Sequence, residues 1–253
     1  MNRTGLLIVL AVAAAVGGVF ALDPGLDIAI SRLFFSPGKP GFPSAGPVVD
    51  YLRDASMWLV ALTAAPAFVA VAAKLLVPVR RMMIPSRAAL FLIATIVLAP
   101  GLTTNIVLKD YWGRPRPNSI SEFGGSEKFV PWWDLRGPCR ENCSFVAGEP
   151  SGAFWTLAAA ALAPAPWRPL AYGAAIAFGL GVGVLRLAFG AHFFTDVAFA
   201  GVFTFLIIWL VHGLIYRWPR TRITDAALER ALERLTKPAY KFFVRLYGGK
   251  KRA

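Results

Sequence analysis

The sequence predicts an all-helical membrane protein, in which about six transmembrane helices form one bundle with both termini in the cytoplasm. Hydrophobic residues make up 57% of the 253 residues and charged residues only 16%, whereas about a quarter of the residues in soluble domains are charged. Several apolar segments reach the length of about 20 residues that a helix needs to cross a bilayer. The net charge of +13 therefore indicates membrane lipids or an anionic substrate as partners, and nucleic acid is not expected.

The first apolar segment, at residues 5–22, follows Arg3 and is expected to be a retained transmembrane helix. A basic start before an apolar stretch is also typical of a signal peptide, with residues 19–21 as a candidate cleavage site. Residues 23–54 are rich in Pro and Gly. Within them, residues 26–35 are expected to form a short amphipathic helix on the membrane surface.

Five further spans are expected after this segment. Pro100 and Gly101 lie inside one of them and predict a kink, which neighbouring helices or polar groups can tolerate. Gly179, Gly181 and Gly183 in a later span would let another helix approach closely. The spans are predicted at about residues 55–77, 88–108, 150–164, 169–188 and 192–215.

The distribution of basic residues predicts the orientation of the bundle, because short loops rich in Lys and Arg stay in the cytoplasm. The loop at residues 79–87 contains three Arg and no acidic residue. Residues 23–54 contain three basic and four acidic residues, and residues 109–149 contain six of each. Both of these longer segments are therefore predicted to be outer loops.

The C-terminal tail is predicted to be a basic amphipathic helix in the cytoplasm. From Arg217 onward it contains eleven Lys or Arg against three acidic residues, and Leu228, Leu232 and Leu235 repeat at helical spacing. Such a tail binds anionic lipid headgroups, or it is an ordinary basic flank of the last span. The chain is thus divided into a six-span domain at residues 1–216 and a tail at residues 217–253.

Two cysteines, Cys139 and Cys143, lie in the second predicted outer loop. The three residues between them allow a small disulfide if this loop lies outside the cytoplasm. A metal site is the weaker interpretation, because no His and no third Cys stands nearby.

Chemically active side chains gather at residues 186–196 (RLAFGAHFFTD), between two apolar segments. Charged groups at a membrane boundary are costly unless they face a polar cavity, so they indicate a functional site. If this segment is helical, His192 and Asp196 share one face, and the carboxylate can hold one ring nitrogen while the other attacks. Arg186 supplies a positive charge suited to phosphate. The alternative is a chance grouping at a polar helix end.

The predicted topology brings further polar residues to the same membrane face. Lys109 and Arg116 follow the outer end of the third span, and Glu149 and Ser151 lie at the outer start of the fourth. Residues 186–196 reach this face from the last two spans. Because separate segments place polar groups at one depth, we expect a single outward-facing site.

These motifs, in this order on six spans, resemble the type 2 phosphatidic acid phosphatase (PAP2) family, which shares its site with vanadium haloperoxidases. Residues 109–117 (KDYWGRPRP) match its motif of Lys, six residues and Arg-Pro. Residues 186–196 match its motif of Arg, five residues, His, three residues and Asp. The resemblance covers roughly residues 109–200 by motif and the whole chain by span count.

The resemblance implies a lipid phosphatase without metal or cofactor, in a bacterial inner membrane, with its site facing the periplasm. His192 would attack the phosphorus and form a phosphohistidine, and Asp196 would stabilise the imidazolium. Three fixed cations would take the place of a metal and stabilise the charge of the transferred group. The phosphate-binding groups would be Lys109, Arg116, Arg186 and the Gly148 backbone N–H.

The middle motif departs from the family pattern, which reads SFPSGH. Here residues 144–149 read SFVAGE, so Ala147 replaces a phosphate-binding Ser. Glu149 replaces the His usually assigned as the acid for the leaving group, and it could donate a proton if protonated near apolar walls. The string Pro-Ser-Gly at residues 150–152 imitates the motif in a shifted register, which would lose both flanking matches.

The substrates that the resemblance implies are undecaprenyl diphosphate, the lipid A 1-phosphate, phosphatidylglycerol phosphate and phosphatidic acid. The altered middle motif favours good leaving groups, that is, diphosphates or an anomeric phosphate, because these need less help from an acid. A catalytically weak pseudoenzyme that binds anionic lipids is the alternative. A transporter is a third hypothesis, which is disfavoured because the predicted spans contain no mid-span charge that could serve as a coupling site. Arg114 is interpreted as a loop charge and His212 as a packed or interfacial residue.

Overall fold

The computed structural model describes residues 1–37, 41–42 and 47–248, and every regular element in these ranges is helical, as predicted. Residues 38–40, 43–46 and 249–253, which belong to the predicted first outer loop and tail, lie outside the described residues. Within the described part, five helical runs are long and apolar enough to cross a membrane. They are α1 (Arg3–Leu22), α3 (Pro47–Leu76), the run of α4 (Ser86–Ile96), η1 (Val97–Leu108) and α5 (Lys109–Tyr111), α8 (Arg168–Ala188), and α9 (Phe194–His212) with η4 (Gly213–Arg217).

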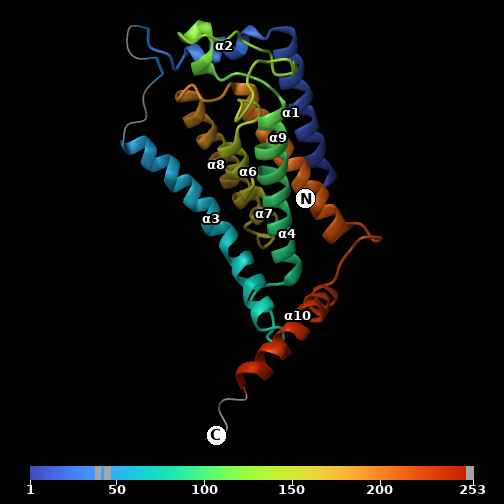
Figure 1. The fold of residues 1–253 in the computed structure, drawn as a ribbon. Coiled ribbons are helices and arrows are strands. Elements are labelled where there is room, and N and C mark those ends of the chain that lie inside the picture. Colours follow the sequence, from blue (N-terminus) through green and yellow to red (C-terminus); the bar gives the residue numbers. More distant parts are fainter. Residues whose placement is uncertain (38–40, 43–46, 249–253) are drawn as a thin grey trace.

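The predicted fourth span, at residues 150–164, is not one of these five runs. It consists of α6 (Gly148–Phe154) and α7 (Thr156–Ala161), which run through the middle of the bundle (Figure 1). Helices of seven and six residues together rise only about 20 Å, less than the ~30 Å hydrocarbon core of a bilayer. Protein rather than lipid surrounds them, because nearly all of their side chains are buried.

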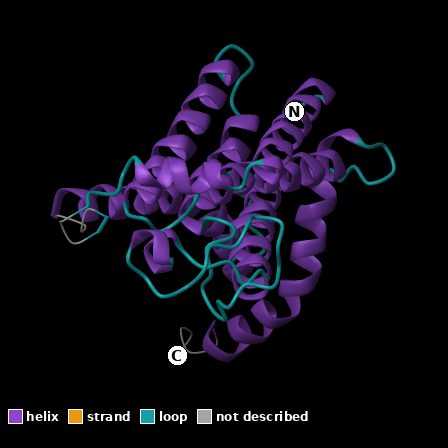
Figure 2. Cartoon of the chain, turned by 90° about the horizontal axis from the view of Figure 1, so that it is seen from above, coloured by secondary structure: helices purple, strands orange, loops and turns teal. Residues whose placement is uncertain are grey.

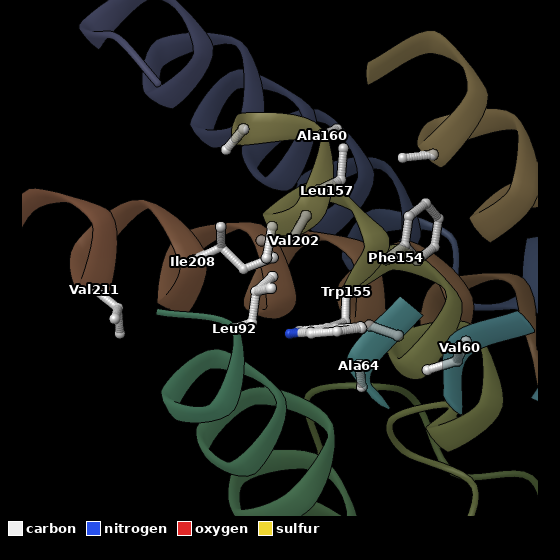
Figure 3. Close-up of a cluster of buried hydrophobic side chains, with 14 of the residues drawn as sticks. Val60, Ala64, Leu92, Phe154, Trp155, Leu157, Ala160, Val202, Ile208 and Val211 are labelled. Carbon is white, nitrogen blue, oxygen red and sulfur yellow. The ribbon is translucent and has the colours of Figure 1, made fainter. Parts of the chain in front are cut away.

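The core packs around this central pair. Trp155 lies between α6 and α7, is fully buried, and its indole N–H donates to Thr95 Oγ1 at 2.9 Å. Figure 3 shows its ring among side chains of α3 and α4, including Ala64 and Leu92. The buried indole thus has a hydrogen-bond partner, which removes the cost of placing its N–H in the core.

Two glycines of α8 allow the close helix contacts that the sequence predicts. A Cβ atom at Gly179 would lie 2.2 Å from the Phe154 ring, and one at Gly183 would lie 2.4 Å from Val197. A Cβ atom at Gly181 would meet nothing within 4 Å. The prediction of close approach is therefore confirmed for Gly179 and Gly183 and wrong for Gly181, which points away from the packed faces.

At Pro100, where the sequence predicts a kink, the structure has the π-helical segment η1, which continues α4. Proline lacks the N–H that an α-helix needs, so a wider turn accommodates it. The Asn105 side-chain amide donates to the Pro100 carbonyl at 2.7 Å and satisfies this backbone group.

The two ends of the bundle differ. At one end, called the loop end here, lie α2 (Gly25–Arg32) and the long connection with η2 (Pro117–Ser119) and η3 (Ser121–Phe123) (Figures 1 and 2). The other end carries α10 (Asp225–Gly248), which ion pairs connect to α3 and α4: Lys74 to Glu233 at 2.8 Å and Arg87 to Asp225 at 2.9 Å. Helix α1 begins, and α10 ends, away from the loop end (Figure 1).

Candidate active site

The imidazole of His192 is buried at the loop end, just before α9. Its Nδ1 lies 2.7 Å from the Ser144 carbonyl oxygen. Because a carbonyl only accepts, Nδ1 carries the proton, and the Nε2 lone pair remains available for attack. Burial is the largest influence on this ring and lowers the pKa of His192 below its usual value, which favours the neutral, nucleophilic form.

Asp196 is held differently from the prediction. Helix α9 begins at Phe194, so His192 precedes the helix, and 3.8 Å separates its Nδ1 from Asp196 Oδ2. The carboxylate instead accepts hydrogen bonds from the Phe193 N–H at 2.7 Å and from the Ser144 hydroxyl. The predicted hydrogen bond to the ring is therefore not formed. Asp196 acts on the imidazole through its negative charge at 3.8 Å. It also binds the Ser144 hydroxyl, and the carbonyl of the same serine accepts from Nδ1.

Arg114 fixes Asp196 in place, and its interpretation as a loop charge is wrong. The side chain is fully buried, and its guanidinium contacts Asp196 at 2.5 Å and Asp27 of α2 at 2.7 Å. It also lies 4.2 Å from the centre of the Phe193 ring. The predicted surface helix α2 thus contributes a buried carboxylate, which shares the Arg114 guanidinium with Asp196 beneath the site.

The Lys109 ammonium lies beside Gly148, the first residue of α6. A Cβ atom at Gly148 would lie 2.9 Å from Lys109 Nζ and 2.7 Å from Asn105 Oδ1. Only glycine leaves this space to the lysine without displacing it. The Gly148 N–H is among the first amide groups of α6, which lack an intrahelical acceptor and suit an anion.

The segment that contains the two cysteines connects Arg116 to the rest of the site. Cys139 and Cys143 form a disulfide with their Cα atoms 5.8 Å apart. Between them, Asn142 accepts from Arg116 Nη2 through its backbone oxygen at 2.9 Å and its side-chain Oδ1 at 2.8 Å. The Cys143 N–H donates to the Lys109 carbonyl at 3.0 Å. One short covalently closed loop therefore orients Arg116 and contacts the backbone that carries Lys109.

Glu149 lies between two arginines, so the apolar surroundings on which its protonation was predicted to depend are not found. Its Oε1 accepts from Arg53 Nε at 2.8 Å, and its Oε2 lies 3.5 Å from Arg186 Nε. Arg53 was missed as a site residue, because residues 23–54 were predicted to be a loop. In the structure it lies in α3, one turn before Ser56 on the buried stripe that continues to Val60.

The shifted register of the middle motif finds no support in the structure. Ser151 is fully buried in the bundle, and its hydroxyl pairs with Thr104 at 3.0 Å and Thr204 at 2.8 Å. Ala147 directly precedes α6, is fully buried, and its N–H donates to the Asp196 carbonyl at 3.2 Å. The register with Ala147 and Glu149 in the middle motif thus places both residues beside the other site groups.

The candidate site consists mainly of cationic side chains and the imidazole of His192, and not of metal ligands. Among the described residues, no group of three or more His, Cys, Asp or Glu side chains could hold a metal ion. His212 lies elsewhere, with its ring 5.6 Å from that of Phe91 in an edge-on contact. This packing agrees with the expectation that His212 is not a site residue.

Comparison with known proteins places these residues in a family context. The family described as the PAP2 superfamily matches residues 88–222. A protein of Francisella tularensis subsp. novicida named "Lipid A 4'-phosphatase" is 42% identical over 133 residues, which cover 52% of this chain and 60% of the relative. Two proteins of the same name, from Rhizobium leguminosarum and Rhizobium etli, are 38% and 37% identical over 105 residues, which cover 42% of this chain and 45% and 41% of theirs. The chain spans about half the length of the curated relatives it matches, and no solved structure matches it significantly.

Proposed function

The chain belongs to the PAP2 superfamily of membrane lipid phosphatases, as its motifs predict, and we propose that it removes a phosphate from lipid A, the 4'-phosphate in particular. The observation that supports a phosphatase reaction is the hydrogen bond from His192 Nδ1 to the Ser144 carbonyl, which leaves the Nε2 lone pair for attack. The names of the relatives favour lipid A among the expected substrates. They also favour an ordinary sugar phosphate over the anomeric phosphate that the altered middle motif suggests.

The mechanism that these residues support has two steps. Nε2 of His192 attacks phosphorus in line, the bond to the sugar oxygen breaks, and a phosphohistidine forms. Lys109, Arg116 and Arg186 compensate the charge on the phosphoryl oxygens, and Asp196 stabilises the imidazolium. Water then attacks phosphorus, which releases inorganic phosphate and returns the neutral ring.

The leaving sugar oxygen needs a proton, and Glu149 is the proposed donor. In the resting protein this carboxylate is an ion-pair partner of Arg53 and Arg186. A phosphate dianion that takes over these arginines leaves Glu149 beside a negative charge, where a carboxyl group favours its protonated form. Substrate binding would therefore convert Glu149 into the protonated form that can donate to the leaving oxygen.

The proposed location is a bacterial inner membrane, with the loop end in the periplasm and α10 in the cytoplasm. The basic residues at 79–87 and in the tail support this orientation. The disulfide at the loop end agrees with it, because disulfides persist outside the reducing cytoplasm. The basic tail that contains α10 is proposed to bind anionic lipid headgroups.

A lipid-binding protein with weak catalysis is the second candidate. Ala147 lacks the hydroxyl that the family motif provides, and Glu149 occupies a place between cations where a phosphate would bind. Both features would reduce turnover without removing the affinity for anionic lipids.

Phosphate release by the purified protein in detergent, with chelator present, tests the proposal. We expect release from lipid A that carries the 4'-phosphate and much less from lipid A without it, phosphatidic acid or undecaprenyl diphosphate. Mass spectrometry of the product should show loss of phosphate from the 4'-position. Binding of these lipids without release would favour the second candidate, and faster release from another lipid would contradict the proposed substrate.

A further inference from the structure

Arg53 lies on the face of α3 that packs against the bundle. Ser56, Val60, Ala64 and Ala67 are buried at helical spacing, and Arg53 continues their stripe by one turn toward the loop end. Arg53 itself is half exposed, so its charge remains in contact with solvent at the loop end. The stripe nevertheless places it on the side of α3 that faces the bundle and not on the side that faces lipid.

The contacts of Arg53 lead into that site. Its Nε and Nη2 lie 2.8 Å and 2.7 Å from Glu149 Oε1, and the other carboxylate oxygen faces Arg186. Helix α3 diverges from its neighbours toward the loop end (Figure 1), and this ion pair connects it to α6. The exposed fraction of the side chains falls inward, from 46% for Arg53 to 19% for Glu149 and 14% for Arg186.

The donors around Glu149 are not used up by it. Arg186 Nε is buried, and in the described part of the chain it finds no acceptor with hydrogen-bond geometry. Lys109 and Arg116 lie close enough to repel each other and Arg186 electrostatically. Asp196 is already paired with Arg114. Glu149 thus faces Arg53 and Arg186 with Lys109 and Arg116 nearby, an arrangement suited to a dianion with more acceptor oxygens.

We propose that Arg53 is a fourth phosphate-binding cation, and that in the resting protein Glu149 occupies the place between Arg53 and Arg186 that a phosphate oxygen takes on binding. The inference rests on the proposed function of this site as a lipid phosphatase. It assigns Arg53 to the mouth of the site, where the phosphorylated head group is recognised, and it makes Glu149 a competitor that the substrate displaces.

Orthovanadate binding to the purified protein, measured by isothermal titration calorimetry in detergent, tests this assignment without requiring turnover. Four proteins are compared: wild type, Arg53→Gln, Glu149→Gln and the double variant. Losing one charge-assisted contact weakens binding by about tenfold to a hundredfold, so Arg53→Gln should raise the dissociation constant by this factor in both backgrounds. Glu149→Gln alone should tighten binding, because the competitor is weakened.

Several outcomes would overturn the inference. If Arg53→Gln weakens binding only when Glu149 is present, Arg53 merely screens that carboxylate and does not contact the anion. Unchanged binding, or no vanadate binding by wild type, would also refute it. The matched control is Arg136→Gln, which removes the same charge from a side chain that is 85% exposed in the loop-end connection; it should leave the dissociation constant unchanged.

Lipid A turnover by wild type separates this inference from the proposed function. Vanadate binding that depends on Arg53, without lipid A turnover, would refute only the substrate. Turnover with vanadate binding that is independent of Arg53 would refute only the role of Arg53. Arg53→Lys, with its charge but without the two-pronged geometry, should lie between wild type and Arg53→Gln. Equal thermal unfolding temperatures of the variants would show that binding, not folding, has changed.

Discussion

Replacing Gly148 with Ala should impair catalysis with little effect on folding. The added Cβ atom would lie 2.9 Å from Lys109 Nζ and 2.7 Å from Asn105 Oδ1, whereas ordinary contacts begin at 3.4 Å. Both neighbours are ends of side chains, so they can yield at small cost in folding free energy. The ammonium must then move by about 0.5 Å. Since a misplacement of 1 Å can cost about 10²-fold in rate, we expect kcat/KM to fall by about tenfold.

Two other glycines provide matched controls for this change. A Cβ atom at Gly152, in the same helix, would meet nothing within 4 Å, so Gly152→Ala should leave both kcat/KM and the unfolding temperature near wild type. Gly179→Ala would drive its Cβ atom into the Phe154 ring at 2.2 Å, so it should lower the unfolding temperature.

Phosphate release in detergent and thermal unfolding are measured on all three variants. Wild-type kcat/KM in Gly148→Ala would refute the placement of Lys109 at the phosphate. A loss of stability as large as that of Gly179→Ala would show that Gly148 has a packing role instead.

Three further predictions concern protonation, the disulfide and the buried network. The neutral His192 ring is the proposed nucleophile, and burial lowers its pKa. The acid limb of kcat/KM should therefore lie below about pH 6.5, the ordinary His pKa; an acid limb above about pH 6.5 would contradict this. Reducing the bond between Cys139 and Cys143 should raise KM and the vanadate dissociation constant, because the loop that holds Arg116 is released; unchanged values after verified reduction would argue against this. Arg114→Gln should destabilise the fold by about 3–5 kcal/mol, the cost of leaving buried carboxylates without their cation, and an unchanged unfolding temperature would contradict its burial.

Patterns that depend on neighbouring residues could be predicted from the sequence. The length of the apolar segments located the long helices. The close helix contacts at Gly179 and Gly183 followed from the spacing of the glycines within α8. The motif spacing at residues 109–117 and 186–196 indicated the family that residues 88–222 match. These features follow from local chemistry, which a sequence displays directly.

Features that depend on partners distant in the chain could not be predicted. Arg114 and Asp27 are 87 residues apart, and nothing in either segment reveals their ion pair. The pairing of Arg53 with Glu149, 96 residues apart, was hidden in the same way. A signal for Arg53 does exist, because extending the apolar stripe of α3 by one turn places the residue on the packed face. This signal was overlooked because residues up to 54 were predicted to be a loop, whereas α3 begins at Pro47.

The most direct test of the mechanism is to trap the phosphoenzyme. Wild type and His192→Ala are mixed with lipid A labelled in its 4'-phosphate and quenched within milliseconds, and the labelled peptide is identified by mass spectrometry. We predict label on His192 that is stable to base and labile to acid, with no label and a loss of several orders of magnitude in kcat for the variant. Label on another residue, or more than about a tenth of wild-type activity in His192→Ala, would contradict the assignment of His192 as the nucleophile.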